Sequence, residues 1–557
     1  MDAVISLFDT GVDLVFSLYT FIIRWLMPLL AFAVLLRSIL PLWQDRKHKK
    51  TWAFLYLVNG DRIPVNNWEN LIGRSKLADI VINLPFISRN HAVLTFHDRH
   101  WQITDLGSKG GVLVNGEKAD KKTAVNFGDT ITLAGLDMTL LPPDDEREAA
   151  ENNDEENSYS FSHATSSITF LLVIVFQVLG ALQICISRGT GKNAAVPAAF
   201  LVFILAECIH YVLMRRRSKK SFVLELLGYF LCGFSLLIVA SAAPGALYKQ
   251  LAAIIAGMVV YTILEAVITD LGRAQKIKYV FMAVAAVLML LNLTIGETYF
   301  GSKNWINLGF ITFQPMELVK VAFVLAGTAT LDRLLTTRNM TAFIAFAGAC
   351  FVTLALIRDF GTAVVFFGAF VVISFMYSGD IRTLLFVVSA AAFGGFAAVS
   401  FMPYIAARFA AWGNVWQYAD TSGYQQTRTM IAAASGGLLG VGGGKGNLYR
   451  VAAADTDLVF GLLCEEWGLV LALIVVAVIV FFTVHAVFST KNCRSSFYAI
   501  AACGSAAIFL LQTTLNVLGS VDILPLTGVT VPFISNGGTS MITSWGLLAL
   551  IKSAEWK

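Results

Sequence analysis

Two pairs of carboxylates flank the start of a long apolar segment, "DTDLVFGLLCEEWGLVLALIVVAVIVFFTV" (455–484). Asp455 and Asp457 stand just before the apolar stretch, and Glu465 and Glu466 lie about two turns inside it. A carboxylate in or near a bilayer is costly, so it is either paired or present for chemistry. At a membrane surface, a carboxylate can act as a general base toward a substrate hydroxyl. The segment therefore indicates a reaction at one face of a membrane.

The composition is that of a membrane protein. The chain has 557 residues, of which 57% are hydrophobic and 14% charged, whereas soluble domains average about 45–50% apolar and about 25% charged. The net charge of +4 is small, and we expect no nucleic acid among the partners. The seven cysteines show no CxxC spacing, so neither a metal site nor a disulfide framework is expected. The N-terminus does not read as a removed signal peptide.

Apolar runs of roughly twenty residues recur along the chain, and each can cross, or nearly cross, a bilayer core of about 30 Å. They lie near residues 14–43, 166–185, 196–214, 221–243, 248–270, 279–295, 317–331, 341–357, 361–377, 383–403, 458–484, 496–520 and 536–551. We therefore expect a polytopic α-helical membrane protein with about thirteen spans.

Basic residues gather in loops that share one side of the membrane if every span crosses. These loops are 44–50, 214–220, 272–278, 331–338 and 491–494. By the positive-inside rule, that side is the cytoplasm. The loops on the other side include 296–316, 404–456 and 521–535. The aspartate pair then lies at the outer face of the membrane.

Residues 51–142, between the first two spans, have a different pattern. Short alternating runs such as "HAVLTFH" and "HWQITDL", separated by glycine-rich turns, predict a small all-β sandwich on the cytoplasmic side. Residues 143–165 are acidic and serine-rich, and we expect a disordered linker there. The expected organisation is completed by an N-terminal transmembrane anchor over 1–50, two additional spans over 166–217 and a membrane core over 218–557.

The sandwich resembles the forkhead-associated (FHA) domain over residues 52–142. The family pattern Gly-Arg, Ser-x-x-His, Asp-x-x-Ser and Val-Asn-Gly occurs in order as Gly73-Arg74, Ser88 with His91, Asp105 with Ser108, and Val114-Asn115-Gly116. Such domains bind phosphothreonine peptides through loops at one end of the sandwich. The resemblance implies a partner that carries phosphothreonine, or a Ser/Thr kinase.

The resemblance also assigns roles to the loop residues. Arg74 and Ser88 would hold the phosphate through a guanidinium fork and a hydroxyl group. Arg89 and Lys109 would add charge, and Asn115 would stabilise the loop structure. The alternative is a domain kept only for protein–protein packing.

One position departs from the FHA pattern. The asparagine that usually holds the peptide backbone is replaced here by Gly110. Phosphate binding does not require that side chain, so we expect phosphothreonine recognition with little selectivity for flanking residues.

Four ordered segments between residue 218 and the end resemble the SEDS family (shape, elongation, division and sporulation), which includes FtsW, RodA and SpoVE. They are "NWINLGFITFQPMELVKVAFV" (304–324), "IRDFGTAVV" (357–365), "GYQQTRTMIAAASGGLLGVG" (423–442) with "TDLVFGLLCEEWG" (456–468), and "LPLTGVTVPFISNGGTS" (524–540). The motif residues we select are Trp305, Gln314, Glu317, Lys320, Asp359, Glu465, Glu466, Pro525, Thr527, Gly528, Pro532, Ser535, Gly537 and Gly538. The departures from the family pattern include Asn304, Met316, Arg358, Leu458 and Asn536.

The resemblance implies a membrane glycosyltransferase that polymerises lipid II into peptidoglycan. Asp457 holds the position of the family's catalytic aspartate, and would take the proton of the acceptor sugar hydroxyl. Undecaprenyl pyrophosphate departs, and its developing charge needs cations or a divalent metal, Mg²⁺ or Mn²⁺. The basic candidates in the long external loop are Arg408, Arg428, Lys445 and Arg450.

The remaining acidic residues are expected to have structural roles. Asp455 is interpreted as a solvated loop residue. Glu465 and Glu466 should be buried and partnered, either as a structural pair or in a link that involves Glu317, Lys320 and Asp359. The glycines at 436, 437, 440 and 442–444 would let the loop backbone approach a bulky ligand, or would simply make it flexible.

Two other functions stay open at this point. The membrane bundle with buried charges also suits a lipid II flippase, although transport does not require a base at the outer face. An inactive scaffold of a cell-wall synthesis complex is the third hypothesis. By family analogy the enzyme works with a class B penicillin-binding protein. The pattern does not distinguish a role in division from one in elongation or sporulation.

Overall fold

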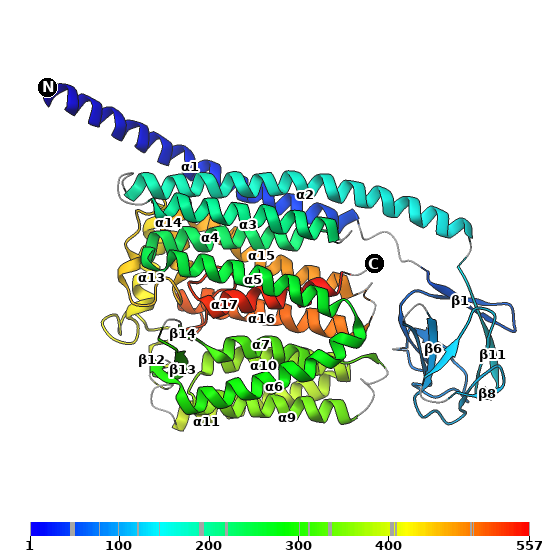
Figure 1. Cartoon of the computed structure of the whole chain (residues 1–557). Helices are drawn as coiled ribbons and strands as arrows, with labels where there is room; N and C mark the ends of the chain where they lie inside the picture. Colours follow the sequence, from blue (N-terminus) through cyan, green and yellow to red (C-terminus); the bar gives the residue numbers. More distant parts are fainter. Residues whose placement is uncertain are drawn as a thin grey trace.

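The computed structural model shows a bundle of helices with a small β-sandwich at one end (Figure 1). It describes the chain except residues 1, 45–50, 77, 98–99, 120–121, 144, 189–193, 218–220, 300, 310–311, 332–336, 402–405, 407–408, 491–492, 494 and 556–557. The basic loops at 44–50, 214–220, 331–338 and 491–494 lie wholly or partly outside the described residues.

Ten helices in the described part of the chain are long and apolar enough to cross a membrane. They belong to α1 (Asp2–Gln44), α2 (Asp145–Arg188), α3 (Ala195–Arg217), α4 (Val223–Ala242), α5 (Leu247–Ile268), α6 (Leu271–Ile295), α9 (Thr337–Leu356), α10 (Phe360–Ser378), α15 (Leu469–Ser489) and α16 (Ser496–Ser520). The other helices are α7 (Pro315–Ala326), α11 (Ile381–Phe401), α13 (Tyr424–Gly436), α14 (Val459–Trp467), α17 (Gly538–Ser553), and the short 3₁₀ helices η2 (Pro244–Ala246) and η3 (Leu448–Arg450). The expected polytopic helical architecture is confirmed.

The apolar run 458–484 was predicted as one span, and this is wrong. Gly468 separates α14 from α15 and has a positive φ of 89°. A Cβ atom at this position would lie 2.4 Å from the carbonyl oxygen of Leu438. The glycine-rich loop therefore packs directly against the break, and only a glycine permits both the φ angle and this close approach.

The interpretation of residues 143–165 as a disordered linker is also wrong. Helix α2 begins at Asp145 and continues without interruption to Arg188. The segment contains alanine, glutamate and arginine, which are strong helix formers, and its acidic residues lie near the helix N-terminus, where negative charge is favourable. Low hydrophobicity alone did not prevent helix formation, because the apolar second half of the same helix is held in the bundle.

The domain is a sandwich of two β-sheets, as the alternating pattern predicted. Most neighbouring strands in these sheets are antiparallel. One sheet has the order β2-β1-β11-β10-β7-β8 and the other β4-β3-β5-β6-β9. The strands are β1 (Ala53–Leu57), β2 (Arg62–Val65), β3 (Glu69–Gly73), β4 (Ile80–Val81), β5 (Ala92–His97), β6 (His100–Asp105), β7 (Val112–Val114), β8 (Glu117–Lys118), β9 (Thr123–Val125), β10 (Thr130–Leu133) and β11 (Leu136–Leu141). Three more strands, β12 (Glu297–Tyr299), β13 (Ser302–Asn307) and β14 (Thr312–Phe313), form a separate small sheet between α6 and α7.

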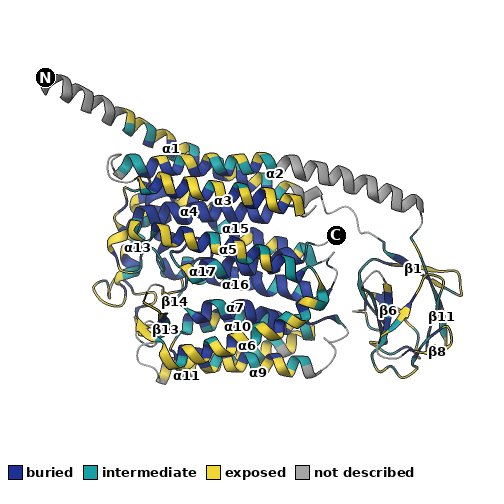
Figure 2. Cartoon of the chain, in the orientation of Figure 1, coloured by how far each residue is buried: buried dark blue, intermediate teal, exposed yellow. Residues whose placement is uncertain are grey.

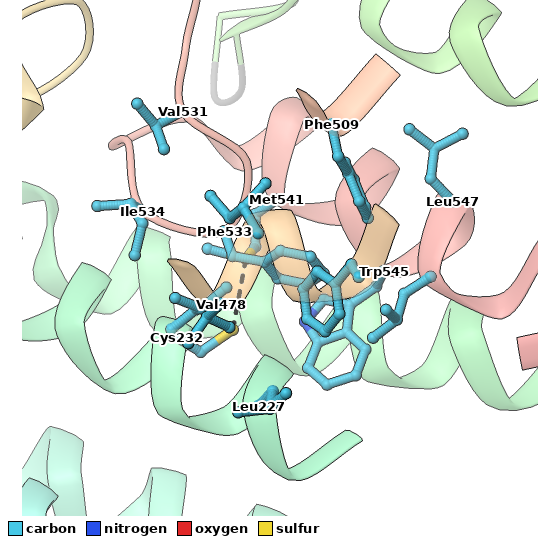
Figure 3. Close-up of a cluster of buried hydrophobic side chains, with 14 of the residues drawn as sticks. Leu227, Cys232, Val478, Phe509, Val531, Phe533, Ile534, Met541, Trp545 and Leu547 are labelled. Carbon is cyan, nitrogen blue, oxygen red and sulfur yellow. Dashed lines mark hydrogen bonds between the residues drawn. The ribbon is translucent and has the colours of Figure 1, made fainter. Parts of the chain in front are cut away.

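Helix α4 lies at the centre of the bundle, and its whole apolar length is buried (Figure 2). Trp545 of α17 is fully buried, and α17 packs against α5 where Gly257 leaves room for the indole ring. Phe533, in the segment before α17, contacts Trp545 edge-on with 5.5 Å between ring centroids (Figure 3). This aromatic core holds the segment between α16 and α17 against the bundle.

The sandwich contacts the bundle through Glu69, the first residue of β3. Its carboxylate accepts hydrogen bonds from the Ser495 hydroxyl (2.5 Å), from the Ser496 amide (2.9 Å) and from the Leu331 amide (3.2 Å). Ser495 is the N-cap residue of α16, and a helix N-terminus favours a nearby negative charge. Arg74 follows the opposite end of β3, so this contact leaves the predicted phosphopeptide loops free of the bundle.

We expect Glu69→Ala to loosen this contact. Hydrogen bonds to a charged group contribute about 1.5–3 kcal/mol, so hydrogen exchange at the Ser496 amide should become roughly ten- to a hundredfold faster. Glu117→Ala, on exposed β8, is the matched control and should leave the exchange unchanged. Equal exchange in both variants would contradict the contact.

The same contact should depend on pH. Burial raises the pKa of the Glu69 carboxyl group, and the hydrogen bonds from Ser495 and Ser496 oppose this only in part. Docking therefore removes the carboxylate from water at a cost that its three hydrogen bonds offset only in part, and protonation relieves this cost. The contact should be strongest below the ordinary value of about 4.5 and weaken as pH rises through the raised pKa.

Candidate active site and phosphopeptide site

Asp457 lies in the turn before α14, at the end of the bundle opposite the sandwich (Figure 1). Its backbone is held at both sides: the amide donates to the carbonyl of Ala453 (2.9 Å), and the carbonyl accepts from the side-chain amide of Asn516 on α16 (2.8 Å). A Cβ atom built on Gly528 would lie 3.2 Å from Oδ2 of Asp457. The partly exposed Asp457 carboxylate therefore faces Gly528.

Asp455, two residues earlier, is tied to the protein. Its Oδ2 accepts a hydrogen bond from Nδ2 of Asn536 (2.6 Å), and its backbone carbonyl accepts one from the Asn536 amide (2.9 Å). The interpretation of Asp455 as a merely solvated loop residue is therefore wrong. The departure at Asn536 has a structural consequence, because this side chain anchors Asp455.

The last SEDS-like motif forms one segment that joins α16 to α17. Its members are Pro525, Thr527, Gly528, Pro532, Ser535, Gly537 and Gly538. The Ser535 hydroxyl donates to the carbonyl of Thr456 (2.6 Å), and Gln250 of α5 contacts the backbone of Ser535 and Gly537. Asn516 donates to the carbonyl of Val529 as well as to that of Asp457. The segment and the Asp457 turn are thus held as one unit.

Glu465 and Glu466, at the end of α14, hold the glycine-rich segment 436–446 and the two residues that follow it. Glu465 accepts from the amides of Asn447 and Leu448, both at 2.9 Å. Glu466 accepts from the Gly444 amide (3.1 Å) and from the hydroxyl of Ser241 on α4. Both side chains are nearly fully buried, as expected.

The predicted link from these glutamates to Lys320 is wrong. Lys320 and Glu317, both buried on α7, form their own ion pair at 2.5 Å. Asp359 caps α10 by accepting from the Thr362 amide (3.1 Å) and also accepts from Nδ2 of Asn304 (3.2 Å). The two glutamates of α14, Glu317 and Asp359 therefore have separate partners. Each carboxylate binds the donor groups that lie nearest to it.

The other two residues of the first motif lie near the small sheet. Trp305 is on β13 and partly buried, with Tyr299 of β12 edge-on at 6.4 Å between ring centroids. Gln314 is the N-cap residue of α7, and its backbone amide donates to the hydroxyl of Thr539 on α17 (3.2 Å). Both residues position elements around the Asp457 end of the bundle.

Three of the predicted basic residues lie in the connection between α11 and α14, and all three are exposed. Arg428 of α13 stacks over the ring of Tyr424 at 5.2 Å, and Arg450 stacks over Tyr449 at 5.7 Å. Lys445 belongs to the glycine-rich segment. Arg408 lies outside the described residues.

The predicted phosphopeptide residues come together at one end of the sandwich. The Arg74 amide donates to the carbonyl of Ser88 (3.0 Å), and the Lys109 amide donates to the Ser88 hydroxyl (3.1 Å). His91 is fully buried and accepts from the Ser88 amide at Nδ1 (3.1 Å), so its Nε2 carries the proton and donates to Gly111 (3.1 Å). The Arg74 and Lys109 side chains are exposed beside the Ser88 hydroxyl, which is an arrangement suited to a phosphate.

Arg89 and Asn115 differ in their relation to this cluster. Arg89 follows Ser88 directly, and its carbonyl accepts from the Ser75 amide (3.1 Å). Asn115 uses its side-chain amide on Asp129 (2.9 Å) and its carbonyl oxygen on the Thr130 amide (2.9 Å). The first of these hydrogen bonds lowers the pKa of Asp129. Asn115 therefore braces a loop, in line with the structural role predicted for it.

The structure explains the departure at Gly110. A Cβ atom there would lie 2.1 Å from Cβ of Ala134, which has a positive φ of 48°. No asparagine fits at position 110 unless the β10–β11 turn moves. The replacement of the usual asparagine by Gly110 therefore goes together with the conformation of this turn.

Several site residues were missed by the sequence analysis. Asn516, Gln250, Ser241 and Thr456 each position a motif residue through a hydrogen bond. The first three are polar residues within apolar helices. Because such residues are uncommon there, this feature of the sequence could have identified them.

Two parts of the chain match known protein families. Residues 220–557 match the FtsW/RodA/SpoVE family, described as "Cell cycle protein", and residues 70–134 match the FHA domain. A probable peptidoglycan glycosyltransferase FtsW of Alcanivorax borkumensis is 33% identical over 298 residues, which are 51% of this chain and 77% of the relative. The Bacillus subtilis protein of that name is 24% identical over 61% of this chain and 91% of its own length.

A solved structure shares the fold of the membrane region. It is described as "Structural coordination of polymerization and crosslinking by a peptidoglycan synthase complex". The matching chain is 25% identical, with a TM-score of 0.51, over 60% of this chain and 97% of the other.

Proposed function

The chain belongs to the FtsW/RodA/SpoVE family of cell cycle proteins, and from this we propose that it is a peptidoglycan glycosyltransferase that polymerises lipid II at the outer face of the cytoplasmic membrane. The observation that carries the proposal is the position of Asp457. Its partly exposed carboxylate faces Gly528, its backbone carbonyl is held by Asn516 of α16, and the α14 that it precedes lies at the end of the bundle opposite the FHA domain (Figure 1).

Asp457 acts as the general base. The acceptor sugar hydroxyl gives its proton to the carboxylate while its oxygen bonds to the anomeric carbon of the donor. The bond from that carbon to the pyrophosphate oxygen breaks, and undecaprenyl pyrophosphate leaves. The start of α14 supports the ionised form of the carboxylate, because a helix N-terminus favours negative charge.

The pyrophosphate needs positive charge as it leaves. We assign this role to the exposed side chains of Arg428 and Lys445. A divalent cation, Mg²⁺ or Mn²⁺, remains part of the proposal as a partner of the pyrophosphate. Among the described residues, no group of three or more His, Cys, Asp or Glu side chains is placed to hold one.

The test is glycan-strand formation from labelled lipid II by the purified protein together with a class B penicillin-binding protein, its proposed crosslinking partner. Polymer is expected. Movement of lipid II across vesicles without polymer would favour the flippase. If the protein shows neither activity but still binds its partner, this result would favour a scaffold.

The FHA domain is proposed to bind a phosphothreonine-containing protein or a Ser/Thr kinase in the cytoplasm. The support is the cluster of Arg74, Lys109 and the Ser88 hydroxyl at its free end. This arrangement makes the enzyme responsive to phosphorylation of a partner.

The proposed orientation makes a labelling prediction. In a cysteine-free background, a cysteine in place of Asp420 should react with an impermeant thiol reagent added outside cells, because that residue is exposed between α11 and α13. A cysteine in place of Lys118, exposed on β8, should react only after lysis. The reverse pattern would overturn the orientation and the assignment of Asp457.

A further inference from the structure

The helices that precede the family match reach the glycine-rich segment 436–446. Helix α2 is joined to α1 by two hydrogen bonds: Tyr19 donates to the carbonyl of Leu179 (2.9 Å), and Gln183 donates to the hydroxyl of Thr20 (3.2 Å). Gln183 is fully buried and also donates to the Ser187 hydroxyl (2.9 Å). The two helices thus present one ordered polar surface at the Asp457 end of the bundle.

The glycine-rich segment packs on this surface. A Cβ atom on Gly442 would lie 3.0 Å from Cγ2 of Thr20, and one on Gly444 would lie 3.2 Å from Cβ of Ser187. Both glycines have positive φ angles, 109° and 78°. The segment therefore lies against α1 and α2 at van der Waals distance, with glycines at its positive-φ positions.

The opposite side of the segment is held by the end of α14. Gly442 donates to the carbonyl of Glu466 (3.0 Å), and a Cβ atom on Gly443 would lie 2.4 Å from the ring of Trp467. Arg24 of α1, Gln183 and Glu466 line one small cavity with these glycines. The segment is thus clamped between the added helices and the helix that follows Asp457.

Lys445 has an exposed side chain in the part of this segment that packs against α1 and α2. Its amide donates to the carbonyl of Gly442 (3.1 Å), whereas Gly442 and Gly446 on either side are buried. We propose that α1 and α2 are a positioning element of the active site, which holds the glycine-rich segment so that Lys445 meets the pyrophosphate of the lipid substrate. This rests on the proposed glycosyltransferase function and assigns a role to helices outside the family match.

The contact itself can be tested without activity. In the full-length, otherwise cysteine-free chain, Ser187→Cys with Gly444→Cys should form a disulfide, because the Cβ atoms lie near the usual separation of about 3.5–4.5 Å. Ser187→Cys with Gly437→Cys is the matched control: a Cβ atom on Gly437 would have nothing within 4 Å. Equal crosslinking of both pairs, or of neither, would overturn the packing.

The positioning role is tested on the crosslinked protein. It should retain at least about half of the polymerisation rate of its reduced form, because the linked arrangement is the proposed active one. A loss of activity that reductant restores would show that the segment must leave α2, and would overturn the proposal. If the reduced and the parent proteins are both inactive, the glycosyltransferase function fails instead.

A second variant separates positioning from folding. Gln183→Leu removes the hydrogen bonds to Thr20 and Ser187 and is apolar enough for the bundle. We expect KM for lipid II to rise roughly three- to tenfold, the effect of one or two neutral hydrogen bonds, with kcat changed less than about twofold. Leu182→Ala, on the exposed face of α2, is the control and should leave both constants unchanged. An unchanged KM in Gln183→Leu would contradict the role.

Discussion

Asp457→Asn is expected to lower glycan-strand formation from lipid II by about 10²–10⁴-fold, the usual contribution of a general base. Asparagine keeps the shape of the side chain, and the backbone bonds to Ala453 and Asn516 do not involve the carboxylate. Expression and binding to the crosslinking partner should therefore be unchanged. The measurement is the amount of polymer formed from labelled lipid II with time.

The matched control for this prediction is Asp455→Asn. It makes the same chemical change two residues away and keeps an oxygen that can accept from Asn536. We expect it to retain most of the activity, within about threefold, because its carboxylate serves to anchor the turn. Normal polymerisation by Asp457→Asn would show that the base lies elsewhere and would move the flippase hypothesis ahead.

Arg74→Ala should weaken binding of a phosphothreonine peptide by about 1.5–3 kcal/mol, or roughly ten- to 150-fold in Kd. Arg74 is exposed, and its backbone amide donates to the carbonyl of Ser88, so its guanidinium group is available at that end of β3. Residues 51–142 have a hydrophobic core of their own, so calorimetric titration of this domain is suitable.

Lys118→Ala is the control for the FHA domain, because it removes a positive charge on exposed β8 that is not among the residues predicted to bind phosphate. Its affinity should stay within about twofold of the parent. Because Gly110 lacks the usual asparagine side chain, we expect similar affinity for peptides with different flanking residues. Equal binding of phosphorylated and unphosphorylated threonine would exclude the phosphopeptide function, whereas a sharp flanking preference would exclude only the lack of selectivity.

Much of the architecture could be predicted from the order of residues. Local periodicity determines helices and strands, so the apolar runs indicated the helical bundle, and the alternating runs indicated the sandwich. Ordered motifs indicated the family and placed Arg74 and Ser88 in one loop cluster. These inferences succeeded because each depends on neighbouring residues or on a fixed sequence pattern.

The tertiary structure decided what depends on contacts between distant segments. The break at Gly468 arises because the glycine-rich segment packs against it, and Glu465 and Glu466 bind that segment rather than Lys320. Asn516 lies 59 residues from the carbonyl of Asp457 that it holds. A buried hydrogen-bonding group binds whichever partner the fold brings within reach, and that choice is absent from local sequence. Residue types and motif spacing could therefore identify the groups capable of chemistry, whereas the contacts made by α14 and α16 could be known only from the packed structure.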